Sequence, residues 1–117
     1  MNRSDRLTSS EDISRVRQVG KTYVDHQIVL SVLPNQIGKN RAAVIAGRSI
    51  GKAVQRNLAK RRIRSAYQSL SSKMRTGYDL VLIARKPLIE RSYQSNLAAL
   101  NSLLEQAKVI LKDKVID

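Results

Sequence analysis

The sequence predicts an α+β fold, a two-layer sandwich in which helices pack against a small sheet. The chain has 117 residues, enough for one domain with a modest hydrophobic core. Hydrophobic residues make up 42% of it and charged residues 26%, a balance typical of folded globular proteins. Segments with the 3.6-residue period of a helix alternate along the chain with segments that have the period of two of a strand.

The N-terminal third predicts one helix and two strands. The helix is expected over residues 10–19, because serines and acids suit its start and Gly20 follows as a stop. Residues 21–33 then alternate with period two, which predicts strands. Asp25 and His26 mark a turn between a short strand and a longer one.

The middle third predicts a strand and a long helix. The strand is expected over residues 41–47, after a loop marked by Pro34 and Gly38. We expect it to lie beside the preceding strand and antiparallel to it. Residues 52–70 contain no proline and repeat apolar side chains at helical spacing, which predicts the helix.

The C-terminal third predicts a buried strand and a last helix. The strand is expected over residues 78–84, which include a run of apolar side chains, and Ser92 is a suitable N-cap for the helix. The apolar stripe of this helix consists of Tyr93, Leu97, Leu100, Leu104, Ala107 and Leu111. We expect the stripe to pack in the core, although its spacing also suits a two-stranded coiled coil.

The charge of the chain points to a polyanionic partner. Lysine and arginine number 22 and aspartate and glutamate 9, which gives a net charge of +13. Such a charge destabilises the compact state, so a partner such as a nucleic acid is expected. With no cysteine and one histidine, His26, the chain has no thiolate nucleophile, disulfide or histidine-rich metal site. Without a signal sequence or an apolar run of membrane-spanning length, we expect a soluble, cytoplasmic protein with no membrane partner.

The predicted helix 52–70 separates its cationic side chains from its apolar ones. One half of its surface, with the turn before it, carries Arg48, Lys52, Arg56, Asn57, Lys60, Arg61 and Arg64. The other half is expected to face the core and carries Val54, Leu58, Ala59, Ile63, Ala66 and Leu70. Arg62 alone lies on the apolar side, where we expect its guanidinium to reach water.

The cationic half of this helix is a candidate surface for RNA. No acid occurs between Gly47 and Leu70, whereas a solvated face usually mixes both signs. Cations four residues apart repel one another, so an external anion is expected to stabilise them. A helix about 28 Å long holds these groups in a fixed array that suits successive phosphates. Arginine supplies forked donors for phosphate, and Asn57 supplies a contact to a base or sugar.

The segment from Arg48 to Arg64 closely resembles the signature of the bacterial ribonuclease P protein subunits. The shared features are Gly51-Lys52-Ala53-Val54, Arg56-Asn57, and Lys60-Arg61 followed by Arg64. Further matches, such as Gly77-Tyr78-Asp79 and Ser92-Tyr93, extend the resemblance over most of the chain.

This resemblance implies that residues 1–117 form a single RNA-binding domain with the family fold. That fold has a small four-stranded sheet and three helices, is ribosomal protein S5 domain 2-like, and contains a left-handed strand-helix-strand crossover. The implied activity is that of an endoribonuclease, in which the protein subunit, a monomer within the holoenzyme, binds the catalytic RNA and the 5′ leader of precursor tRNA. The RNA subunit carries the catalysis and holds most of the magnesium together with the substrate phosphates, so no catalytic residue is expected in this chain.

The chain departs from the family pattern in its Arg-Asn-Arg motif and in its leader cleft. The Arg-Asn-Arg motif of the family reads Arg56-Asn57-Leu58 here, without the third cation. The family cleft that accepts the leader, between the first helix and the sheet, often carries aromatic side chains. The residues assigned to this cleft here are Ile13, Arg17, Val29, Ser31 and Tyr67. Of these, Tyr67 is expected on the cationic face, where its ring either stacks on a base or covers the helix end.

Three other functions compete with this one on the sequence alone. A basic helix also suits the major groove of duplex DNA, but strands separate the helices here and leave no helix-turn-helix. A basic ribosomal protein shares the charge and the fold class, and assistance to cleavage distinguishes the two. A membrane-surface helix is disfavoured, because the apolar half contains small alanines and no tryptophan or phenylalanine.

Overall fold

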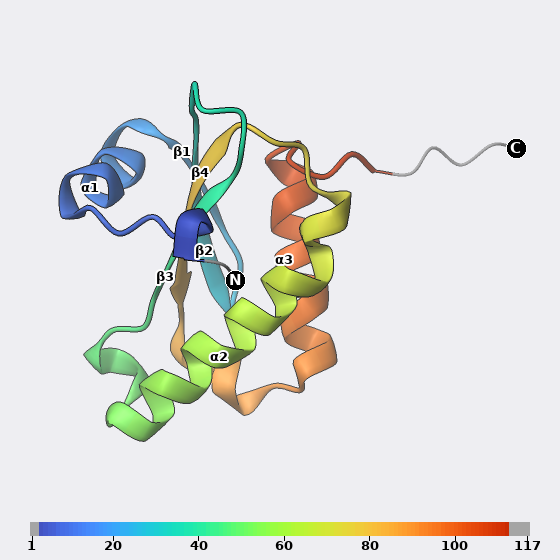
Figure 1. Cartoon of the computed structure of the whole chain (residues 1–117). Coiled ribbons are helices and arrows are strands. Elements are labelled where there is room, and N and C mark those ends of the chain that lie inside the picture. The colour runs from blue at the N-terminus through green and yellow to red at the C-terminus, as the bar shows by residue number, and fades with distance from the viewer. Residues whose placement is uncertain (1–2, 113–117) are drawn as a thin grey trace, which may run out of the picture.

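The computed structural model describes residues 3–112 and has three α-helices around a four-stranded sheet (Figure 1). The helices are α1 (Ser10–Val19), α2 (Ala53–Leu70) and α3 (Tyr93–Gln106). The strands are β1 (Lys21–Val24), β2 (Ile28–Pro34), β3 (Arg41–Ile45) and β4 (Tyr78–Ala84). Short 3₁₀ turns occupy Arg3–Asp5, Arg48–Ile50, Ser71–Lys73 and Lys86–Glu90. The predicted α+β fold is confirmed, with α1 as a partial extra layer on the second face of the sheet.

The order of the strands corrects one prediction. The sheet has the order β1-β2-β4-β3, with antiparallel pairs except for the parallel pair of β3 and β4. The expectation that residues 28–33 and 41–47 form adjacent antiparallel strands is therefore wrong, because β4 lies between them. The run Leu80–Leu82 is fully buried, which suits a central strand covered on both faces. The left-handed sense of the β3-α2-β4 crossover stays a prediction.

Two hydrophobic clusters lie on opposite faces of the sheet. Because side chains alternate along a strand, Leu30 and Leu82 point to the face covered by α2 and α3, whereas Val81 points to the face covered by α1. Val16 of α1 packs in the second cluster and is almost fully buried. Burial of each such aliphatic side chain contributes about 1.5–3 kcal/mol.

The bounds of α1 are those that the sequence predicts, because its ends are defined locally. The Ser9 side chain accepts a hydrogen bond of 3.3 Å from the N–H of Asp12, and the N–H of Gly20 donates to the Val16 carbonyl over 2.9 Å. A Cβ at Gly20 would lie 2.5 Å from the Val16 oxygen and 2.7 Å from the Val32 oxygen. Glycine is thus required where α1 ends against β2.

Two boundaries of these elements and the burial of one side chain differ from the predictions. The strand expected to reach residue 47 ends at Ile45, where the chain turns toward a 3₁₀ turn, and the long helix begins at Ala53 with Lys52 as its N-cap. The first turns of α2 extend past the end of the sheet (Figure 1). Val54 is therefore 79% exposed rather than packed, and the buried stripe begins at Ala59.

The last helix ends earlier than its apolar stripe implies. α3 stops at Gln106, and Lys108 has a φ of 60°, so the chain leaves the helical path there. Leu111 lies outside the helix and is 63% exposed, which corrects its assignment to the stripe. Leu100 and Leu104 are buried as expected, so this helix packs in the core. Among residues 3–112, no helix is both long and apolar enough to cross a membrane.

Candidate nucleic-acid interface

The predicted RNA-binding residues lie on consecutive segments of the chain. The cationic face, as we call it, consists of Arg48, Lys52, Arg56, Asn57, Lys60, Arg61 and Arg64. Its first residue belongs to the 3₁₀ turn, its second is the N-cap of α2, and the other five lie on the helix. Gly51 joins the turn to the helix with a φ of 139°, a conformation that favours glycine. Turn and helix therefore present one continuous surface.

The side chains of the cationic face have no partners within the part of the chain that the structure describes. Both ion pairs found there involve Arg41, which lies on β3. None of the seven side chains of the cationic face makes a hydrogen bond to residues 3–112, and all seven are exposed or half-buried. Their charges repel one another and remain available to an external anion.

Arg62 differs from its cationic neighbours. Its guanidinium donates a hydrogen bond of 2.7 Å to the backbone carbonyl of Arg91, in the segment before α3. The sequence pattern does not predict this contact with the neighbouring backbone. The difference arises because Arg62 lies on the side of α2 that faces α3, so its long side chain reaches the neighbouring backbone.

Leu58 replaces the third cation of the family motif and is half-buried. It is absent from both hydrophobic clusters. With the exposed Val54, one turn earlier, it forms a small apolar border to the cationic face.

Four of the five residues assigned to the leader cleft lie on the α1 side of the sheet. Ile13 and Arg17, one turn apart on α1, line the same shallow hollow. Val29 and Ser31 lie two residues apart on β2, so both side chains point to the face of the sheet that α1 covers. The Ser31 hydroxyl is buried and shares a hydrogen bond of 3.0 Å with Thr22, so it is less accessible than the half-buried Val29.

The cleft and the cationic face meet at the edge of the sheet. Ile13 of α1 and Arg64 of α2 line one hollow, whose floor is β3 and whose rim includes Arg6. The N-terminal segment runs along the outside of β3, where the Leu7 N–H donates to the Ala42 carbonyl over 2.9 Å. The structure thus brings the two predicted sites together.

Tyr67 does not belong to the cleft. It packs in the cluster on the opposite face of the sheet, among side chains of α2 and α3, and is only 6% exposed. Of the two roles expected for its ring, stacking on a base from the cationic face is therefore wrong. Burial, together with the charge of Asp5, raises the pKa of Tyr67 to about 12, so the hydroxyl stays protonated at neutral pH.

An ion pair that sequence reasoning missed joins β3 to β4. Arg41 of β3 donates two hydrogen bonds, of 2.9 and 2.7 Å, to the carboxylate of Asp79 in β4. Asn35 donates a third over 2.9 Å, and Arg41 also lies 3.9 Å from Asp12 of α1. Burial alone raises the pKa of Asp79, but the hydrogen bonds outweigh it and hold the pKa below its ordinary value. A lone acid within an apolar strand is the signal that marks this pair in the sequence.

An α+β fold with an unpartnered cationic helix face beside a cleft is the architecture of a nucleic-acid-binding protein. The family model described as Ribonuclease P matches residues 1–108. The chain therefore belongs to the ribonuclease P protein family. It is a component of that ribonucleoprotein nuclease, takes part in tRNA 5′ processing, and associates with the ribonuclease P RNA.

Similar proteins cover nearly the whole described chain. The ribonuclease P protein component of Chloroflexus aggregans is 41% identical over 108 residues, which are 92% of this chain and 80% of that protein. The one from Herpetosiphon aurantiacus is 35% identical over 109 residues, with 93% and 89% covered. The structure of the Staphylococcus aureus RNase P protein superposes with a TM-score of 0.81 at 27% identity, covering 91% and 97% of the two chains. The structure of the Thermotoga maritima RNase P protein superposes with a TM-score of 0.79 at 27% identity, covering 86% of this chain and 96% of that one.

Proposed function

We propose that this protein binds the catalytic RNA of ribonuclease P through its cationic face and contacts the 5′ leader of precursor tRNA in the cleft beside α1. It acts in the cytoplasm as a monomer within the holoenzyme and forms a single RNA-binding domain. The RNA subunit performs the cleavage, and the protein contributes by binding and by positioning the leader. Magnesium is held mainly by the RNA and the substrate phosphates.

One observation carries this proposal: seven adjacent side chains, six of them cationic, have no partner within residues 3–112. Phosphates of a folded RNA would relieve the repulsion between these cations and release the counterions of the RNA. The arginines supply bidentate donors that suit phosphate oxygens, and Asn57 adds a donor and an acceptor for a base or sugar.

The donor groups of the chain do not fit a protein-held magnesium ion. Among the described residues, no three histidine, aspartate or glutamate side chains come together as a set of ligands. The carboxylate of Asp79, on β4, is already engaged by Arg41 and Asn35. No step of the proposed function therefore uses a metal ion bound by this chain.

The test is multiple-turnover cleavage of a precursor tRNA by the cognate catalytic RNA at low magnesium, with and without the protein. We expect the protein to restore correct 5′ cleavage. The double variant Arg56→Ala, Lys60→Ala removes two charges from the cationic face and weakens RNA binding. Its slope of log affinity against log salt falls by about 0.7 to 0.9 for each RNA phosphate that the protein no longer neutralises.

The matched control is the double variant Lys21→Ala, Lys86→Ala, which removes the same charge from two exposed residues outside the cationic face. We expect it to keep the wild-type salt slope. Equal slopes for the two double variants contradict the assigned surface. Tight RNA binding without any rescue of cleavage favours a ribosomal or general RNA-binding protein instead.

A further inference from the structure

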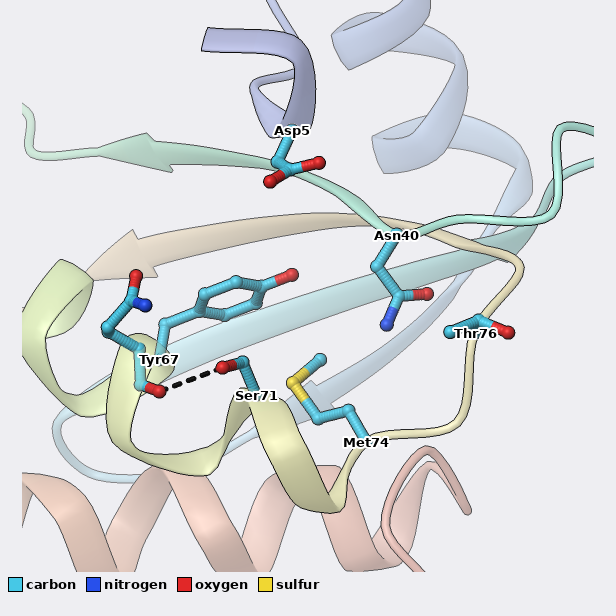
Figure 2. Close-up of a pocket in the computed structure, with 7 residues that line it drawn as sticks. Asp5, Asn40, Tyr67, Ser71, Met74 and Thr76 are labelled. Atoms are coloured by element: carbon cyan, nitrogen blue, oxygen red, sulfur yellow. Dashed lines mark hydrogen bonds between the residues drawn. The ribbon is translucent and has the colours of Figure 1, made fainter. Parts of the chain in front are cut away.

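A polar hollow of about 250 Å³ opens at the C-terminal end of α2 (Figure 2). Its walls come from the N-terminal 3₁₀ turn, the residue before β3, the end of α2 and the segment before β4. Residues from these four segments line it: Asp5, Asn40, Tyr67, Ser71, Met74 and Thr76. Figure 2 shows the Tyr67 hydroxyl pointing into the space between Asp5 and Asn40.

Two groups in this hollow are available to a ligand. The Tyr67 hydroxyl makes no hydrogen bond to any residue from 3 to 112. Asp5 is half-buried and has no ion-pair partner among the side chains that the structure describes. Asn40, by contrast, is engaged, because its amide donates to the Arg75 carbonyl over 2.8 Å and accepts from the Tyr78 N–H over 2.9 Å. The available pair is thus one carboxylate acceptor and one phenol donor.

The hollow continues the cationic face. Gln68 lines it and lies one helical turn after Arg64, on the same side of α2. On the other side, the Lys39 ammonium donates to the Ser4 carbonyl over 2.8 Å, next to Asp5. The carboxylate of Asp5 repels a phosphate from the hollow itself. The cations on both sides of the hollow bind the phosphates that flank an inserted base.

We propose that this hollow binds an unpaired guanine of the RNA held by the cationic face. The inference rests on the proposed RNA binding and adds a base-specific contact to it. Guanine presents two neighbouring donors, N1–H and the N2 amino group, which match the two oxygens of Asp5. Its O6 then accepts from the Tyr67 hydroxyl.

The other bases do not fit this pair of groups. Adenine and cytosine place a ring nitrogen acceptor beside their amino group, and that acceptor would face the carboxylate of Asp5. Uracil offers a single donor, N3–H, between two carbonyl acceptors. Single-stranded RNA is commonly recognised through such contacts to the Watson–Crick edge of a splayed base.

The first experiment is a titration of the full chain, followed in ¹H–¹⁵N NMR spectra, with guanosine, inosine and adenosine 5′-monophosphate. Guanosine monophosphate is expected to shift the amide signals of Asp5, Gln68 and Thr76. Inosine monophosphate lacks the N2 amino group and is expected to bind at least about fivefold more weakly. This factor is the low end of the discrimination that a bidentate contact to a base provides. Adenosine monophosphate is expected to shift only signals of the cationic face. Identical shifts with all three nucleotides mean phosphate binding alone and overturn the proposal.

Two variants test whether the Asp5 carboxylate and the Tyr67 hydroxyl recognise the base. Asp5→Asn is expected to abolish the preference for guanosine over inosine, whereas the control Glu11→Gln, an exposed acid on α1, keeps it. Tyr67→Phe removes only the hydroxyl and is expected to weaken guanosine binding while the spectrum stays that of the folded protein. An unchanged preference in Asp5→Asn overturns the proposal.

A footprint on the holoenzyme separates this inference from the proposed function. Kethoxal modifies N1 and N2 of unpaired guanines, the two atoms assigned to Asp5. Wild-type protein is expected to protect one guanine that Asp5→Asn leaves reactive. If the protein rescues cleavage but both proteins give the same footprint, the guanine site is wrong and the proposed function stands. If the wild-type protein fails to bind the RNA, both fail.

Discussion

Arg62 donates a hydrogen bond of 2.7 Å to the backbone carbonyl of Arg91, whereas the adjacent Arg61 makes none within residues 3–112. The bond connects α2 to the segment that leads into α3. Two neighbouring arginines therefore serve different purposes. One connects two elements of the fold, and the other belongs to the surface assigned to RNA.

This difference predicts opposite effects of two alanine variants. Arg62→Ala is expected to lower the free energy of unfolding by about 1 kcal/mol, the loss of one charge-assisted hydrogen bond at a partly exposed position. Its RNA affinity keeps the wild-type dependence on salt. Arg61→Ala is expected to leave stability unchanged and to flatten the salt dependence. Urea denaturation and RNA binding at several salt concentrations measure the two quantities, and a reversed pattern contradicts the assignment.

Asp79→Asn is expected to change how stability depends on pH. The hydrogen bonds from Arg41 and Asn35 overcome the effect of burial and hold the pKa of Asp79 below its ordinary value of 3.8. The folded carboxyl therefore binds a proton less tightly than the unfolded one. Its contribution is present above about pH 4 and is lost as the pH falls through the folded pKa.

The variant is consequently expected to be less stable than the wild type at pH 7, by about 2 kcal/mol for the missing charge-assisted hydrogen bonds. The difference should shrink as the pH falls below about 4. Urea denaturation between about pH 2 and pH 7 tests this. A difference that is constant over that range rules out the ion pair as its source.

Gly20→Ala is expected to destabilise the protein by about 1–3 kcal/mol, the range for overpacking. The added Cβ would lie 2.5 and 2.7 Å from two backbone oxygens, which cannot move without shifting α1 or β2. Gly47→Ala is the matched control, because nothing lies within 4 Å of a Cβ there. Thermal denaturation of both variants checks the contrast, and equal losses of stability would argue against the close approach of helix and strand.

Val29→Tyr is expected to strengthen leader binding. Val29 is half-buried on the α1 side of the sheet, and no phenylalanine or tryptophan occurs in the chain. An aromatic ring there offers a stacking partner to an unpaired base, worth about 1 kcal/mol or more. The affinity of the holoenzyme for precursor tRNA is compared with that for mature tRNA, which lacks the leader. An equal gain for both RNAs places the effect outside leader binding.

The sequence predicts best those features whose causes are local. The caps of α1 and the segregation of charge on α2 depend on residues within a few positions of one another, and both are confirmed. The neighbour of β3 depends on whether β2 or the later β4 pairs with it, and sequence spacing does not decide this. The periodicity of α2 places Val54 on the apolar side, but only the tertiary structure shows that the sheet ends before reaching it.

The candidate sites follow the same rule. The cationic face is a local pattern and is fully visible in the sequence. The pair of Arg41 and Asp79 exists only because β3 and β4 are adjacent, and the hollow forms only because the N-terminal turn brings Asp5 near Tyr67. Such long-range relationships leave no periodic trace along the chain.

The start of α2 is anchored at two points, the buried Ile50 before it and the buried Ala59 within it, with no buried side chain in between. This stretch can open while the hydrophobic core stays intact, so its amide hydrogens exchange with solvent through local fluctuations rather than global unfolding. Repulsion between its cations lowers the cost of opening. RNA phosphates would remove that repulsion, so RNA binding is expected to suppress the local opening of this part of the helix. Slower hydrogen exchange at residues 53–58 in the RNA complex would show this.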